Sequence, residues 1–237
     1  MILPDLRTRD TAVRESMDDP HCDPAMLDRT YAQFGVVNAL VAGWKRSYRQ
    51  HLRPLLSRGR VNTLLDIGSG GGDVARSIAG WARRDGLALD VTAADPDERA
   101  HAWALGRQPS PGLEFRQAFS SDLVAEGRTF DLVISNHLLH HLDDEQFRSV
   151  LDDSEKLARL RAVHSDIHRS RAAYVVFSNG TRPVFRRSFI RADGLVSIRR
   201  SHTARELRAA APPGWRVQRQ APWRNLLIHD AADAVGV

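Results

Sequence analysis

A short apolar run that ends in an acid and a glycine-rich turn constrains the fold of this chain most. Residues 61–67 (VNTLLDI) are followed by Gly68, Gly70 and Gly72, and then by a segment with a helical pattern. A buried parallel strand that enters a tight turn and a helix has this pattern. Glycines let the backbone approach a ligand closely, and the helix N-terminus offers unpaired N–H groups. The segment therefore predicts an adenosine-type cofactor on a doubly wound α/β sheet.

The glycine turn must be compared with two other nucleotide-binding patterns. The phosphate-binding loop needs a lysine after its glycines, and this turn has none. Residues 70–75 (GGGDVA) do satisfy the dinucleotide fingerprint. However, Asp66 and Asp73 flank the turn, and two carboxylates would repel a pyrophosphate. The acids favour a ligand that carries a positive charge and no phosphate.

Several segments together resemble the class I (Rossmann-like) S-adenosylmethionine (SAM)-dependent methyltransferases. Residues 66–72 (DIGSGGG) resemble motif I of that family, and Asp95 ends a second apolar strand as the family's ribose-binding acid does. The segments 130–136 (FDLVISN) and 137–144 (HLLHHLDD) resemble the fourth strand and following loop of the ubiquinone/menaquinone-type methylases and their natural-product relatives. The resemblance implies a mostly parallel seven-stranded sheet, an N-terminal helical lid and SAM as cofactor.

The resemblance also implies a set of cofactor-binding residues. Asp95 is expected to accept hydrogen bonds from both ribose hydroxyls, because a carboxylate is an acceptor for a diol. Relatives often have an acid near the adenine amine after the third strand, but residues 114–119 (EFRQAF) lack it there. The adenine is therefore expected against backbone groups and Phe119. The full expected set is Asp66, Gly68, Ser69, Gly70, Gly72, Asp73, Asp95, Pro96, Ala118, Phe119, Asn136 and His137.

Apolar periodicity divides the chain into a lid and a core. Residues 1–60 are expected to be a helical lid, with a loose stretch 1–22, a helix start at Asp23-Pro24 and breaks at Gly35 and Gly43. Residues 61–237 are expected to be the SAM-binding domain, because strands and helices alternate there. Its expected elements are strands 61–67, 88–94, 113–117, 129–135 and 160–166, helices 72–84, 97–105 and 143–159, an insertion of a helix plus a loop at 167–202 that walls the acceptor pocket, a capping box at Thr203–Glu206, and a terminal hairpin of 215–220 and 223–228.

Histidines after the fourth strand are the candidates for proton transfer. His140 and His141 lie nearest the transfer site by resemblance, and imidazole titrates near neutral pH. The alternative is that these rings only brace the loop or position the cofactor. The expected catalytic set is His137, His140, His141 and Asp166, and the expected acceptor-binding set is Tyr31, Phe34, Asn38, Trp44, His168 and Phe189.

A metal site can also be drawn on the same loop. His137 and His141 are four residues apart, and Asp143 and Asp144 follow them. Adjacent acids more often cap the next helix, so no metal is predicted.

Composition restricts the compartment and the partners. The 237-residue chain has one cysteine, Cys22, which excludes disulfides and fits a reducing cytoplasm. It has no apolar run long enough to span a membrane and no signal-peptide pattern at its start, so no membrane insertion is expected. The net charge is +5, but apart from Lys45 and Lys156 all basic residues are arginines, which disfavours a dedicated nucleic-acid surface. The oligomeric state is not predicted.

The acceptor is defined mainly by exclusion. Residues 135–138 (SNHL) replace the N/D-P-P-Y motif of amine and amide methylases, and the core holds no cysteine nucleophile. The sequence therefore predicts SAM-dependent methyl transfer to a small, mainly apolar acceptor in secondary metabolism, with the hydroxyl of a phenolic, polyketide or quinol compound favoured. The alternatives are C-methylation of such a ring, RNA methylation through the arginine-rich insertion, and a non-catalytic SAM-binding subunit.

Overall fold

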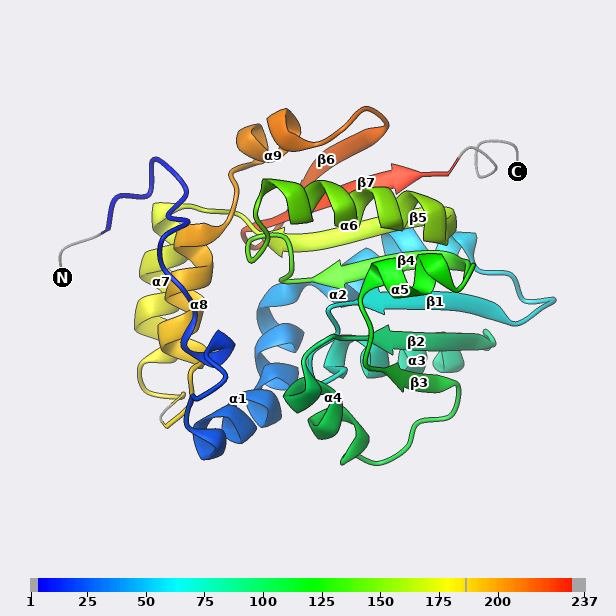
Figure 1. The fold of residues 1–237 in the computed structure, drawn as a ribbon, viewed down its shortest axis with the longest axis horizontal. Helices are drawn as coiled ribbons and strands as arrows, with labels where there is room; N and C mark the ends of the chain where they lie inside the picture. Colours follow the sequence, from blue (N-terminus) through cyan, green and yellow to red (C-terminus); the bar gives the residue numbers. More distant parts are fainter. Residues whose placement is uncertain (1–3, 186, 232–237) are drawn as a thin grey trace.

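A single seven-stranded sheet organises the computed structural model, which describes residues 4–185 and 187–231. The strand order is β3-β2-β1-β4-β5-β7-β6 (Figure 1). Strands β1 to β5 pair in parallel, and β7 runs antiparallel to both neighbours, β5 and β6. This confirms the mostly parallel, Rossmann-like sheet. The strands are β1 Asn62–Ile67, β2 Leu89–Ala94, β3 Leu113–Arg116, β4 Phe130–Asn136, β5 Ala158–Ile167, β6 Trp215–Gln220 and β7 Arg224–Asp230.

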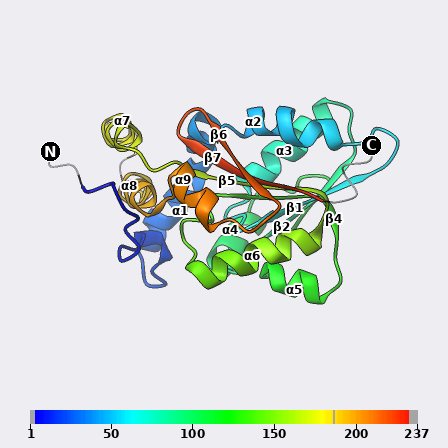
Figure 2. The same ribbon diagram turned by 90° about the horizontal axis from the view of Figure 1, so that it is seen from above.

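Apolar side chains alternate between the two faces of the sheet and bury both. Leu64 packs against helices α2 and α3, whereas the next residue, Leu65, packs against α5, α6 and α9. Figure 2 shows the sheet edge-on, with α2 and α3 on one side and α5 and α6 on the other. The helices are α1 Pro24–Val37, α2 Trp44–Ser47, α3 Asp73–Arg84, α4 Glu98–Leu105, α5 Ser120–Ala125, α6 Asp144–Leu157, α7 Arg171–Thr181, α8 Ile190–Arg200 and α9 Ala204–Ala210.

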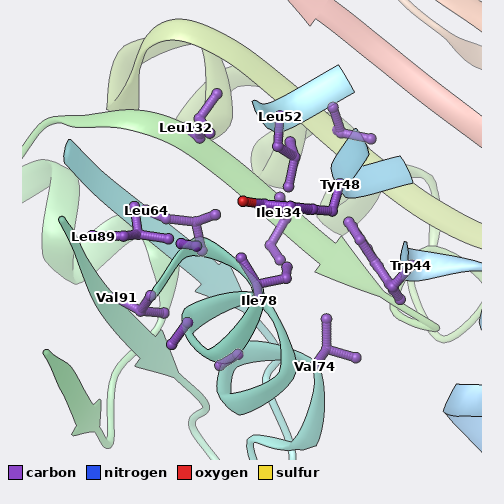
Figure 3. Packing of buried hydrophobic residues seen from close by; sticks show 14 of the residues in the cluster. Trp44, Tyr48, Leu52, Leu64, Val74, Ile78, Leu89, Val91, Leu132 and Ile134 are labelled. Carbon is purple, nitrogen blue, oxygen red and sulfur yellow. The ribbon is translucent and has the colours of Figure 1, made fainter. Parts of the chain in front are cut away.

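The helical segment before β1 begins at the expected cap and is divided at Gly43 into α1 and a part that packs in the core. The Asp23 side chain caps α1 by accepting from the amides of Ala25 and Met26. Gly43 adopts a left-handed conformation and breaks the helix, but Gly35 lies inside α1, so the predicted break there is wrong. Beyond Gly43 the chain packs into the core, where Trp44 contacts the cluster that Figure 3 shows.

The carboxyl ends of the parallel strands are covered by segments from distant parts of the chain. Helices α1, α7 and α8 and the N-terminal stretch gather there (Figure 1). The insertion 167–202 was expected to be one helix plus a loop, but it forms two helices packed closely. A Cβ on Gly194 of α8 would lie 2.4 Å from the Phe177 ring of α7. Such contact explains why a small residue occurs inside a helix.

Residues 4–22 make specific contacts with α8, whereas residues 1–22 were expected to be loose unless a ligand orders them. The amides of Ser16 and Met17 donate to the Asp193 carboxylate of α8 at 2.8 and 3.0 Å. The Asp10 amide donates to the Arg199 carbonyl. Local polarity gave no sign of these partners, because they lie about 180 residues further along the chain. Parts of both predicted domains lie outside the described residues, namely 1–3 of the lid and 186 and 232–237 of the SAM-binding domain.

The remaining expectations concern single elements. The hairpin of β6 and β7 and the capping box of Thr203 and Glu206 are present. Helix α5 was not predicted, because its six residues are too few for a helical period to show. Within residues 4–185 and 187–231, no helix is both long and apolar enough to cross a membrane.

Candidate active site

A large cavity opens where the carboxyl ends of the strands meet the covering helices. Its volume is about 1400 Å³. It extends from the glycine turn after β1 to the loop after β4, with α1, α7 and α8 as walls. It brings together thirteen of the residues singled out by the sequence: Tyr31, Phe34, Asn38, Gly68, Ser69, Gly70, Asp73, Asp95, Pro96, Asn136, His137, His140 and His141.

Two glycines of the turn are needed for different reasons. Gly72 has a φ of +74°, and a Cβ there would lie 2.3 Å from the Phe115 ring, so no side chain fits. Gly70 has a φ of +53°, but a Cβ there would meet no protein atom within 4 Å. Because Gly70 lines the cavity, the open space at this position is available to a ligand.

One buried carboxylate, of Asp66, and two half-buried carboxylates, of Asp73 and Asp95, surround this turn. Neither oxygen of Asp66 has a hydrogen-bond partner in the described residues, and the side chain lies behind the turn rather than in the cavity lining. Burial raises the pKa of Asp66 well above its usual value, and the charges of Asp73 and Asp95 raise it further. A positively charged ligand would relieve this repulsion, whereas a pyrophosphate would increase it. These carboxylates therefore fit the positively charged ammonium and sulfonium of SAM.

The Asp95 carboxylate lies at the end of β2 and keeps acceptor capacity. Its two oxygens accept from the amides of Gly70 at 2.7 Å and Asp97 at 2.9 Å. A carboxylate has about four lone-pair sites, so these two bonds leave room for a diol. Asp95 thus fits the predicted ribose contact.

The predicted adenine contacts are not brought into the cavity. Phe119 is 62% exposed, and its amide donates to Asp122 as α5 begins. Ala118 is buried but also absent from the cavity lining. Here the helix start at Ser120 turns the chain away, and Asp97 and Ala100 line the cavity beyond Pro96 instead.

A chain of polar side chains joins the lid to the sheet. The Asn38 amide donates to Asp73 at 2.8 Å, and the Asn136 amide donates to the Asn38 oxygen at 3.2 Å. Arg224 of β7 then donates to Asn136 at 2.8 Å and contacts the His137 ring nitrogen Nε2 at 2.7 Å. Arg224 was not predicted as a site residue; in the sequence it is a polar residue shortly before the apolar run 226–228 of β7.

Burial beside this arginine fixes the charge of His137. Burial lowers the pKa of His137 well below its usual value, and the charge of Arg224 lowers it further. The ring is therefore neutral at pH 7, and its Nε2 accepts from the guanidinium. That bond occupies the nitrogen that a general base would need.

His140 lies between two carboxylates and is fully buried. Its Nδ1 lies 2.7 Å from Asp166 Oδ1, and its Nε2 lies 3.2 Å from Glu15 Oε1. Burial alone would lower the pKa of His140, but the charges and hydrogen bonds of Asp166 and Glu15 raise it to about 9. His140 therefore holds a proton at pH 7 and donates to both carboxylates.

His141 is the most open ring of this cluster. Its side chain is 27% exposed, its Nδ1 lies 3.2 Å from Asp18 Oδ2, and its Nε2 lies 3.6 Å from Glu15 Oε1. Glu15 and Asp18 were missed by the sequence analysis, because nothing local distinguishes them from solvated acids in a polar stretch. Asp143, which follows the histidines in the sequence, caps α6 by accepting from the amides of Glu145 and Gln146.

Three predicted acceptor-binding residues lie away from the cavity lining. Trp44 belongs to the core cluster beneath α3 (Figure 3), because Gly43 turns the chain toward the sheet. Phe189 packs beside Tyr31 and Leu27 in a separate cluster that supports α1. His168 continues from β5, and its amide donates to the Trp223 carbonyl.

Arginines of the insertion are partly engaged inside the molecule. Arg200 donates to the carbonyls of His140 and His141, and Arg191 donates to Ser178. Arg199 forms an ion pair with Asp10. These contacts tie the insertion to the N-terminal stretch and to the loop after β4.

Comparisons with known proteins agree with this geometry. A family model described as "Methyltransferase domain" matches residues 64–160. A ubiquinone biosynthesis O-methyltransferase of Rhizobium leguminosarum bv. trifolii (strain WSM2304) is 30% identical over 86 residues. That match covers 35% of this chain and 32% of the relative, so the chain matches about a third of its length.

Two solved structures share the fold at low sequence identity. The magnesium protoporphyrin IX methyltransferase of Synechocystis PCC 6803, with bound SAH, has a TM-score of 0.52 at 16% identity, covering 85% of this chain and 84% of that one. The plantazolicin methyltransferase, in complex with a monoazolic desmethylPZN analog and SAH, has a TM-score of 0.54 at 13% identity, covering 85% of both chains. The predicted fold is thereby confirmed. Residues 64–160 match a methyltransferase domain, and the glycine turn and the sheet order agree with the class I SAM-dependent methyltransferases that the sequence resembles.

Proposed function

We propose that this chain transfers a methyl group from SAM to a hydroxyl of a small aromatic acceptor, such as a phenol or a quinol. The observation that carries the proposal is the single cavity that joins the glycine turn to His141. Its volume of about 1400 Å³ exceeds the roughly 300–1,000 Å³ of ordinary ligand pockets, so it has room for a cofactor and an acceptor together.

The cavity has two ends of different character. Asp73 and Asp95 line the end at the glycine turn, which suits a cationic cofactor with a ribose. The far wall is mainly apolar and comes from α1, α7, α8 and the segments that follow α1 and α7. Its side chains include Val37, Val41, Phe177, Phe185, Ile190 and Ile198. An apolar wall with a few polar groups at one place favours an acceptor that is mostly hydrocarbon and carries its reacting oxygen near the histidines.

A phenolic acceptor has to lose its proton for efficient transfer. A phenol has a pKa of about 10, so a base must act at neutral pH. His140 already holds a proton, and His137 is occupied by Arg224. We therefore assign the base role to His141 and keep His140, with Asp166, as a positioning pair. His137, grouped with them by sequence, is assigned to positioning the loop.

Each of these residues then has one role in the displacement reaction that transfers the methyl group. Bound SAM supplies an electrophilic methyl carbon on its sulfonium. The His141 Nε2 removes the hydroxyl proton, the oxygen forms the new bond to carbon, and the carbon–sulfur bond breaks. Asp18 holds the imidazole by its Nδ1, and the apolar wall excludes water from the reacting oxygen. O-methylation is favoured over C-methylation because the Rhizobium relative is an O-methyltransferase.

Turnover with a defined panel tests the proposal. The full chain is incubated with methyl-labelled SAM and a series of phenols and quinols, and products are identified by mass spectrometry and NMR. We expect a methyl ether from at least one phenol, and a decrease of about 10²–10⁴-fold in turnover for His141→Gln. The matched control is His21→Gln, an exposed histidine outside the cavity.

Cofactor binding separates the possible outcomes. Calorimetric titration with SAH should give micromolar binding to wild type and to His141→Gln, with no binding of NADH. A ring-methylated product would favour the C-methylation alternative. SAH binding without any product from the panel would contradict the proposed acceptor class, and binding of NADH alone would overturn the cofactor.

A further inference from the structure

We propose that Glu15, His140 and His141 form a binding site for one divalent transition-metal ion at the wall of the cavity. The three side chains come from two segments that are 125 residues apart, the N-terminal stretch and the loop after β4. One ligand atom of each lies within 4.8 Å of the others. All three residues also line the cavity, so an ion here would face the acceptor.

The distances between the ligand atoms fit one ion. Glu15 Oε1 lies 3.2 Å from His140 Nε2 and 3.6 Å from His141 Nε2. Zinc binds such atoms at about 2.0–2.2 Å, which puts neighbouring ligand atoms of a tetrahedral site roughly 3.3–3.6 Å apart. Both distances from Glu15 are close to this range.

Both histidines are oriented in the way that metal-binding histidines usually are. Asp166 Oδ1 lies 2.7 Å from the Nδ1 of His140, and Asp18 Oδ2 lies 3.2 Å from the Nδ1 of His141. A carboxylate on the far nitrogen fixes the ring and its tautomer so that Nε2 binds the metal. This arrangement occurs twice here, and both Nε2 atoms approach the same oxygen of Glu15. A lone general base would need only one such pair.

The charges and the ligand types indicate the class of ion. Three carboxylates, of Glu15, Asp18 and Asp166, lie around the two rings, while Arg200 directs its donors to main-chain carbonyls. Two imidazoles and one carboxylate suit zinc, iron(II) or manganese better than magnesium or calcium. Three protein ligands leave at least one coordination position open, as catalytic sites do.

An ion at this position would change what the cluster does. It would bind the acceptor oxygen directly and lower the pKa of that hydroxyl, so His141 would be a ligand rather than the proton acceptor. An acceptor with two neighbouring oxygens could bind through both. The ion would take the place of His141 as the group that activates the hydroxyl, and it would displace the Nε2 proton that His140 shares with Glu15. The source of the methyl group does not depend on the ion, so a binding test separates the two proposals.

Cobalt(II) titration of the metal-free full chain tests the site. The chain is first dialysed against a chelator, and cobalt is then followed by its visible d–d absorption. We expect saturation at one ion per chain and displacement by zinc. His141→Gln and Glu15→Gln should each abolish the one-to-one saturation, and Asp18→Asn should weaken it by about 10–100-fold as an orienting residue. His21→Gln, which removes an exposed histidine, should bind cobalt like wild type.

Each other outcome overturns the proposal. The proposal fails if the wild type shows no saturable cobalt binding. It also fails if His141→Gln binds cobalt as the wild type does, or if His21→Gln loses as much binding as His141→Gln. Glu15 is buried, so Glu15→Gln could fail to fold. The His141→Gln and Asp18→Asn variants then still test the site, because both side chains are partly exposed. SAH binding without cobalt binding would overturn the ion site and leave the methyl-transfer proposal standing. Cobalt binding without SAH binding would do the reverse.

Discussion

The two ends of the cavity are built in different ways. At the cofactor end, the glycine turn, Asp66 and Asp73 lie within eight residues of one another and follow one strand. At the acceptor end, Glu15, His140 and Asp166 meet from three distant segments. The first end depends on local backbone geometry, and the second depends on charges that are paired only in the folded chain. Substitutions at the two ends should therefore fail for different reasons.

The largest effect is expected at His140. His140→Leu would leave Asp166 and Glu15 buried without their shared partner, and removing one member of a buried charge group costs about 3–5 kcal/mol of unfolding free energy. His141→Leu is the matched control. Its side chain is partly exposed, so we expect a loss below about 1 kcal/mol. Urea unfolding of both variants measures the difference, and equal losses would remove the distinction between the two rings.

The next effect separates two glycines of the same turn. Gly72→Ala forces a Cβ into the Phe115 ring at a positive φ, which should cost about 3 kcal/mol of stability. Gly70→Ala has the same backbone strain without the clash, so about 1 kcal/mol is expected. Because Gly70 lines the cavity, its variant should instead lose SAH affinity. Thermal melts with and without SAH measure both quantities. Equal stability losses would show that Phe115 moves aside.

The sequence predicted the cofactor end better than the acceptor end for a physical reason. A turn with a positive φ at Gly72 restricts the residue type at that position, so the glycine pattern is visible in the chain itself. Glu15 looks like any surface acid, since its burial depends on α8 and on the loop after β4. Trp44 shows the opposite error, because its helical spacing suggested a cavity wall and Gly43 turned it into the core. Fold and elements were thus predictable, whereas pairings between distant segments were not.

A smaller effect concerns acid stability beside the acceptor end. Burial lowers the pKa of His202 to about 4, and its Nε2 lies 2.9 Å from Arg9 Nη1, which requires a neutral ring. The folded state therefore binds fewer protons than the unfolded state, whose histidine pKa is about 6.5. This contribution to stability is present above pH 6.5, decreases as the pH falls, and levels off below pH 4.

Comparison with a variant isolates this one group. His202→Gln should reduce the difference in unfolding free energy between pH 7 and pH 4 by on the order of 1–3 kcal/mol. Urea unfolding at several pH values measures it for both proteins, so that other titrating groups cancel. An unchanged difference would mean that folding does not lower the pKa of His202.

The smallest effect is expected where the two ends meet, at Asn38. This side chain donates to Asp73 at the cofactor end and accepts from Asn136 beside the acceptor end. Asn38→Ala removes one hydrogen bond to a half-buried carboxylate, which is worth about 0.5–1.5 kcal/mol, so SAH affinity should fall by roughly 2–13-fold. Burial raises the pKa of Asp73 and the bond from Asn38 lowers it, so this bond helps to keep the carboxylate charged for a cationic ligand.

A double-mutant cycle with Asp73→Asn shows whether Asn38 acts through this carboxylate. If it does, the loss from Asn38→Ala should shrink in the Asp73→Asn background, because the charge that the amide supports has gone. The acceptor KM provides the second measurement. A change in acceptor KM that survives in the double mutant would mean that Asn38 acts through Asn136, and the two ends would then be one coupled unit. A KM that does not change would keep them separate, with Asn38 belonging to the cofactor end alone.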